Sequence, residues 1–109
     1  MAYSESLAAR VRHALRDQGR IVEKRMFGGL ACLLRGNLCV ALIDQSLIVR
    51  VGPAAYEAAL AEPHVREFDI TGRPMRGWVV ADPEAIDLDA DLHRWIERAV
   101  EFVQTLPAK

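Results

Sequence analysis

The fold of this chain is decided by residues 30–51, which read LACLLRGNLCVALIDQSLIVRV. Three short runs rich in apolar and β-branched residues, 30–34, 38–43 and 46–51, are separated only by turn-forming residues, which predicts an antiparallel meander. Arg35-Gly36-Asn37 suits a tight hairpin because glycine and asparagine tolerate positive φ, and Asp44-Gln45 suits a second turn. Because the runs are nearly continuous in apolar residues, we expect both faces of the sheet to be covered, one by helices and the other by a partner or a further helix.

Upstream of the meander, residues 4–17 are predicted to form an amphipathic helix. Ser4 suits its N-cap and Gly19 its end. Its buried stripe follows helical spacing and comprises Leu7, Ala8, Val11, Ala14 and Leu15. A further strand is expected over Ile21–Met26, and the pair Gly28-Gly29 marks a turn or a bulge after it.

Downstream, Gly52-Pro53 is predicted to end the sheet and to start a second helix, since proline suits a first helical position. Strands follow over residues 65–70 and 77–81, and a long helix is expected over about 87–105. Its predicted buried face consists of Leu88, Leu92, Trp95, Ile96, Ala99 and Val103. The order α, three or four β, α, two β, α predicts an α+β fold with helices packed on an antiparallel sheet.

The bulk properties are those of one ordinary globular domain over residues 1–109. Hydrophobic residues make up 51% and charged residues 27%, and the net charge of −1 provides no overall field that would recruit nucleic acid or a membrane. The N-terminal residues lack the features of a signal peptide, and no apolar run approaches the ~20 residues of a membrane span. We therefore expect a cytoplasmic location.

No recognised catalytic, cofactor-binding or metal-binding motif occurs in the sequence. The three histidines, His13, His64 and His93, are dispersed and lack the spacing of metal ligands. We therefore expect no enzymatic activity, no cofactor and no metal.

Cys32 and Cys39 lie on opposite arms of the predicted hairpin. A three-residue loop would place their thiols on opposite faces of the sheet, and a two-residue loop at Gly36-Asn37 would make them diagonal neighbours. Neither register suits a disulfide, so buried free thiols are expected. Arg50 interrupts an apolar strand, and alternation favours a side chain that points to solvent over one buried with a carboxylate.

Two segments combine cations with an aromatic residue and glycine. The first is Lys24-Arg25-Met26-Phe27-Gly28-Gly29, and the second is Gly72-Arg73-Pro74-Met75-Arg76-Gly77-Trp78. If the fold brings them together, Lys24, Arg25, Phe27, Arg73, Arg76 and Trp78 form a candidate binding surface for an acidic peptide or single-stranded nucleic acid. The competing interpretation, that Phe27 and Trp78 are buried in the core, is favoured because the chain has few aromatic residues.

At these same segments the chain resembles the N-terminal domain of TfoX/Sxy-type proteins. The similarity extends from the first amphipathic helix through Lys24–Leu30, the Gly36-Asn37 hairpin, residues 47–53 and the Gly72–Trp78 segment to the final helix. The resemblance implies an α+β fold of the secretion-chaperone-like type. It also implies a regulatory association, because the family member that gives it its name regulates natural competence. It brings no catalytic residues with it.

Together these features predict a non-enzymatic domain that binds another macromolecule. A protein partner is expected first, with self-association into a homodimer as one form of it. Nucleic-acid binding through Lys24, Arg25, Arg73 and Arg76 is the second hypothesis. A small-molecule binder or an unusual enzyme is the third hypothesis, and no motif supports it.

Overall fold

The computed structural model describes residues 3–26, 28–69 and 72–108. Six antiparallel strands form one open sheet in the order β1-β2-β3-β4-β6-β5. Their bounds are β1 Ile21–Met26, β2 Gly29–Leu34, β3 Asn37–Ile43, β4 Ser46–Arg50, β5 Val65–Asp69 and β6 Pro74–Ala81. The predicted α+β class, with helices packed on an antiparallel sheet, is confirmed. The secretion-chaperone-like comparison stays a prediction.

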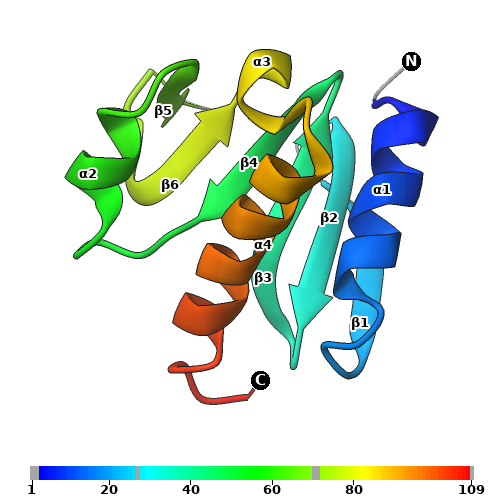
Figure 1. Cartoon of the computed structure of the whole chain (residues 1–109). Coiled ribbons are helices and arrows are strands. Elements are labelled where there is room, and N and C mark those ends of the chain that lie inside the picture. Colours follow the sequence, from blue (N-terminus) through cyan, green and yellow to red (C-terminus); the bar gives the residue numbers. More distant parts are fainter. Residues whose placement is uncertain (1–2, 27, 70–71, 109) are drawn as a thin grey trace.

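The helices are α1 Glu5–Leu15, α2 Tyr56–Leu60, α3 Pro83–Ile86 and α4 Asp89–Val103. Figure 1 shows α1 and α4 lying side by side across the face of the sheet formed by β2 and β3. The Ser4 side chain accepts a hydrogen bond of 3.2 Å from the Leu7 backbone N–H, which confirms the predicted N-cap of α1. No helix in the described part of the chain is long and apolar enough to cross a membrane.

The main core lies between the helices and this face of the sheet. All four helices contribute to it, and its largest fully buried side chain is that of Trp95 on α4. The predicted stripe of α4 is correct for Leu92, Trp95, Ile96, Ala99 and Val103, all of which are buried. The stripe is wrong at Leu88, which is 66% exposed.

Leu88 is exposed because α4 begins at Asp89, later than predicted, so that Leu88 is its N-cap and lies outside the helix. The short helix α3, which the sequence analysis did not predict, precedes it and opens at Pro83, for which the fixed φ of proline is suited. The chain then becomes extended at Leu88 (φ −84°, ψ 140°), which separates α3 from α4. The second helix also begins later than predicted, at Tyr56, because Val51 and Gly52 still donate backbone hydrogen bonds to the Gly77 carbonyl.

The hairpin between β2 and β3 turns on Arg35-Gly36, whereas the expected loop included Asn37. Leu34 pairs directly with Asn37, and both turn residues have positive φ (54° and 81°), as a two-residue turn matched to the strand twist requires. A bulge follows, because Cys32 pairs with Val40 and Leu33 with Leu38, which leaves Cys39 without an opposite residue.

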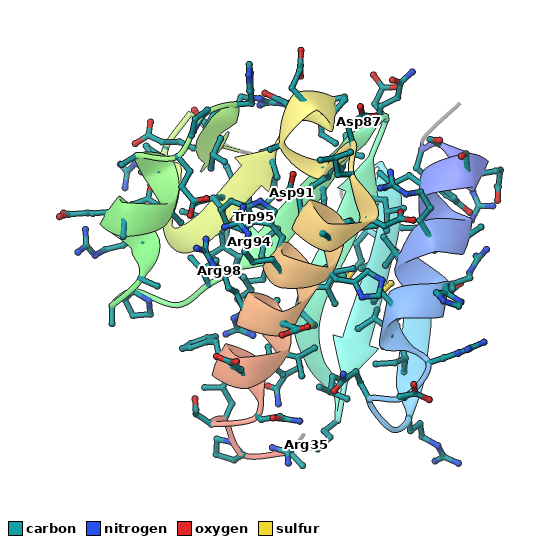
Figure 2. The ribbon with its side chains drawn as sticks, in the orientation of Figure 1. Arg35, Asp87, Asp91, Arg94, Trp95 and Arg98 are labelled. Carbon is teal, nitrogen blue, oxygen red and sulfur yellow. The ribbon has the colours of Figure 1, made fainter. Side chains whose placement is uncertain are left out.

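The chain ends are attached to the two ends of β3. At one end, the Ser4 backbone N–H donates to the Asp44 carbonyl at 2.7 Å. At the other end, Arg35 donates to the Leu106 carbonyl at 2.7 Å, and the buried Asn37 side chain donates to the Pro107 carbonyl at 2.9 Å. Figure 2 shows Arg35 beside the C-terminal segment.

Candidate functional site

The second face of the sheet has an apolar cluster to which no helix contributes. Its buried members come from five strands: Ala31, Ala41, Ile48, Phe68 and Val80. The partly buried side chains packed around them also come from strands: Leu33, Leu38, Ile43, Met75 and Trp78. We call this surface the helix-free face, and among the described residues it is covered by no other element.

The edge strand β1 extends the helix-free face. Residues directly opposite in antiparallel strands share a face. Val22 pairs with Leu33 of the second cluster, and Met26 lies on the same side of β1 by the two-residue alternation. Val22 is 44% exposed and Met26 is 38% exposed. Among the described residues, these two and Leu88 are the exposed large hydrophobic side chains, so two of the three lie on this face.

The charges that the register places on the helix-free face are cationic. Lys24 pairs with Ala31, Arg50 with Trp78, and Arg66 with Val80. Each of these partners belongs to the second cluster or packs against it. The face therefore combines an apolar surface with positive charge.

Asp82 is the carboxylate at the border of this face. Arg66 donates to it at 3.0 Å and the Ser46 hydroxyl at 2.9 Å. Burial alone would raise the pKa of Asp82, but these hydrogen bonds outweigh it and the pKa is lowered. Asp82 thus stays ionised and offsets part of the charge of Arg66.

Arg50 differs from the expectation that it points to solvent. Its guanidinium lies 5.0 Å from the centre of the Trp78 ring and 5.6 Å from that of Phe102, and it donates to the Leu38 carbonyl at 3.2 Å. The bulge at Cys39 lies beside Leu38 in this part of β3. The guanidinium of Arg50 is therefore surrounded by aromatic rings and a carbonyl, and not by solvent or by a carboxylate, the two environments considered from the sequence.

The structure separates the five described residues of the candidate surface predicted from sequence. Lys24 and Arg25 lie on β1, whereas Arg76 and Trp78 lie on β6, and β2, β3 and β4 intervene. At a strand spacing of ~4.8 Å this amounts to roughly 19 Å. The two segments therefore do not form one contiguous patch. Whether either segment binds a partner stays a prediction.

Neighbouring residues of the two segments also lie on opposite faces. Arg25 pairs with Leu30 of the main core, so it lies on the helix side of β1, opposite to Lys24. Arg76 lies 5.5 Å from the Tyr56 ring on α2, whereas Trp78 packs on the helix-free face with its ring centre 6.3 Å from that of Phe68. Arg73 is exposed between β5 and β6. Phe27 lies outside the described residues.

A second polar cluster connects α2 to α4, and Figure 2 shows Arg94, Trp95 and Arg98 on the side of α4 that is directed toward α2. Glu62 accepts hydrogen bonds from both Arg94 and Arg98. The guanidinium of Arg98 lies 4.5 Å from the centre of the Trp95 ring. Burial alone would raise the pKa of Glu62, but the hydrogen bonds from Arg98 and Arg94 lower it. The cluster thus joins two helices by charge-assisted hydrogen bonds.

A hollow of about 410 Å³ lies beside this cluster. Its lining includes Ala55, Ala58, Ala59 and Phe102, so its depth comes from small side chains on α2. Arg98 and Glu62 also line it, but they already satisfy each other. We therefore interpret the hollow as a gap in the packing between α2 and α4, left where the side chains on α2 are small.

Both thiols of the chain are buried in the main core. Cys32 and Cys39 are free and buried, as expected. Burial raises the pKa of Cys32 to about 11 and that of Cys39 to about 12, so both stay protonated near neutral pH. The bulge places both in the main core, in contrast to the opposite faces of the three-residue register. The described residues hold no group of three or more potential metal ligands.

The sequence analysis missed Val22, Met26 and Arg66 as residues of a common surface. The signal was present in β1, where Val22, Lys24 and Met26 alternate with Ile21, Glu23 and Arg25. Their grouping with Arg66 needed the strand order, which places β5 at the far edge of the sheet.

The fold and this surface define an α+β protein with one helix-covered and one apolar, cationic sheet face. The family model of the TfoX N-terminal domain matches residues 13–103, which is most of the chain. The chain belongs to the TfoX N-terminal domain family, as the resemblance in its sequence implied. Comparisons with curated proteins and with solved structures found no significant match.

Proposed function

We propose that this chain is a non-enzymatic protein-binding domain that docks an apolar segment of another protein on the helix-free face. The observation that carries the proposal is the second apolar cluster, which spans β2 to β6 without a contribution from any described helix. Exposed Val22 and Met26 extend it at the β1 edge. Together with the partly buried side chains around the cluster, these two residues form a continuous apolar surface, and such surfaces mark interaction sites.

A protein segment suits this face better than a nucleic acid does. The cations proposed from sequence for a nucleic acid, Lys24, Arg25, Arg73 and Arg76, lie on different strands and on both sides of the sheet. A phosphate backbone needs several cations along one path. Apolar side chains around Lys24 instead match the mixed contacts of a protein segment.

The test is affinity capture from native lysate with three forms of the chain. The first is the wild type, the second carries Val22→Thr and Met26→Gln, and the third carries Leu88→Gln. Leu88 is the matched control because it is exposed and lies between α3 and α4, away from the helix-free face. Nuclease treatment is included in parallel.

We expect proteins that the wild type and Leu88→Gln capture equally, in the presence of nuclease, and that the double variant loses. The same proteins on all three forms would remove the helix-free face as the docking site. Loss of all capture on nuclease treatment would favour the nucleic-acid hypothesis in its place.

A further inference from the structure

We propose that the partner segment is acidic, with aspartate or glutamate side chains interspersed among its apolar residues, and that Lys24 is its principal charged contact. This inference rests on the proposed function, because it names the chemistry of the segment that the helix-free face would bind. The argument begins with how the strand register distributes charge between the two faces.

The register sends the acidic and the basic residues of the edge strands to opposite faces. On β1, Glu23 pairs with Cys32 of the main core, whereas Lys24 pairs with Ala31 of the second cluster. On β5, Glu67 pairs with Val79 of the main core, whereas Arg66 pairs with Val80 of the second cluster. Both edges therefore present a cation on the helix-free face and an acid on the helix side.

The acidic residues on the helix side do not neutralise the cations of the helix-free face, because they lie on the other side of the sheet. Glu23 receives two hydrogen bonds from Arg12 of α1, at 2.7 and 2.9 Å. On the helix-free face, Asp82 offsets Arg66, while Arg50 is held between two rings. Three cations against one carboxylate leave this face with an excess of positive charge.

Lys24 is the cation that is free to meet a partner. It is exposed and makes no hydrogen bond or ion pair with the residues described by the structure. It lies on β1 between Val22 and Met26, both exposed on the same face. A segment that covers these two apolar side chains must also cover the ammonium group, and an unpaired buried charge is costly. A carboxylate on the segment removes that cost.

The same charges disfavour a second copy of the chain as the occupant. In a two-fold interface built from this face, each contacting surface carries Lys24, Arg50 and Arg66. Contacts among these cations would join like charges, and Asp82, which already accepts from Arg66, is the single carboxylate assigned to the face, so the net charge opposes association. With an acidic partner, the same cations would instead face carboxylates, and the charged contacts would be attractive.

The experiment is a selection from a random peptide display library against the immobilised chain. Enriched peptides are then titrated in solution, with tryptophan fluorescence as the readout, because Trp78 is partly buried on the helix-free face. We expect enriched peptides to combine apolar residues with aspartate or glutamate. Their affinity should fall as salt concentration rises, because salt screens the attraction between an acidic peptide and the net positive charge of the face.

Two charge-reversal variants on neighbouring residues test the contact itself. Lys24→Glu reverses a cation on the helix-free face, and Arg25→Glu makes the same change in net charge one residue later, on the helix side. Affinity for the selected peptides should fall about tenfold for Lys24→Glu, because the variant places a carboxylate against the acidic side chain of the peptide. It should change little for Arg25→Glu.

The outcomes separate this inference from the proposed function. Peptides that lack acidic residues, yet lose affinity when Val22 and Met26 are made polar, would overturn the acidic partner and leave the docking face standing. An equal loss for Lys24→Glu and Arg25→Glu would likewise overturn the assignment of Lys24. If no selected peptide depends on Val22 and Met26, the proposed function itself is wrong.

Discussion

At the scale of single residues, two adjacent glycines have different roles in the turn before β2. Gly28 has a φ of +75°, and a Cβ atom there would meet open space. Gly29 is buried, and a Cβ atom there would lie 1.9 Å from the Leu42 carbonyl oxygen on β3. Gly28 therefore accommodates the positive φ of the backbone, and Gly29 is required because β2 and β3 approach closely at this point.

Gly29→Ala should therefore destabilise the fold strongly, because the backbone of β3 cannot move away as a flexible side chain could. We expect a loss of about 1–3 kcal/mol in the free energy of unfolding, measured by urea denaturation. Gly28→Asn is the matched control, since asparagine tolerates positive φ. Equal stability of Gly29→Ala and the wild type would contradict the close approach of β2 and β3.

At the scale of elements, α4 holds the helix layer on the sheet. It packs on the sheet through Trp95, which is fully buried, and it is joined to α2 by Arg94 and Arg98 through Glu62. The indole N–H of Trp95 has no hydrogen-bond partner among the described residues, so this side chain contributes through packing and through the guanidinium groups stacked on it.

Trp95→Ala should lower the free energy of unfolding by about 3–5 kcal/mol, because it removes a large buried side chain and leaves a cavity. Chemical denaturation followed by far-UV circular dichroism measures the change. His93→Ala, on an exposed position of the same helix, is the control and should leave stability nearly unchanged. Near-native stability of Trp95→Ala would mean that the register of α4 is wrong.

The ion cluster between α2 and α4 should make stability depend on pH in the acidic range. The pKa of Glu62 is lower in the folded chain, so its contribution is present above the unfolded pKa of about 4.3 and is lost as pH falls through the folded value. The wild type should therefore lose more stability between about pH 5 and pH 3 than Glu62→Gln does. Urea denaturation across this range tests it.

The control for that series is Glu97→Gln, on α4. Glu97 is exposed and forms no ion pair with the described residues. This variant should lose stability with falling pH as the wild type does. Parallel pH profiles for the wild type and Glu62→Gln would contradict the role of the Glu62 cluster.

Helices and strands with a regular apolar period could be predicted from the sequence. Features that depend on contacts between residues distant in the sequence could not. The stripe of α1 and the runs of β2, β3 and β4 carry their own periodicity. The break at Leu88 could not be predicted, because Leu88 continues an apolar pattern although its backbone is extended at the N-cap of α4. The separation of Lys24 from Trp78 likewise follows from the strand order, which no local pattern contains.

At the scale of the whole molecule, the sheet divides the chain into a covered side and the helix-free face. The continuous apolar runs predicted that both faces would be covered; helices cover one face, and cover of the other by a partner stays a prediction. Covering one face uses all four helices of the described residues. The other face is left with an apolar cluster and with cations that oppose its association with a copy of itself.

The chain should accordingly stay monomeric at low ionic strength. Light scattering coupled to size-exclusion chromatography measures its mass over a range of concentrations. Lys24→Glu supplies an acid opposite the remaining cations of a second copy, so this variant should associate more than the wild type does. A stable wild-type dimer at low salt that dissociates in the Val22→Thr, Met26→Gln double variant would favour self-association through this face.

Because residues near both ends of the chain are hydrogen-bonded to the ends of β3, the length of this strand sets the distance between them. Residues 3–4 lie at the Asp44 end of this strand and residues 104–107 at its Arg35 end, while the strand itself runs from Asn37 to Ile43. Six steps of ~3.4 Å make the strand roughly 20 Å long, and the anchoring residues Asn37 and Asp44 lie at its two ends. Dyes attached at the two termini would therefore report, by energy transfer, whether β3 and both of its anchors are assembled. A surface tether at residue 4 or residue 107 would hold the chain by an end of this strand.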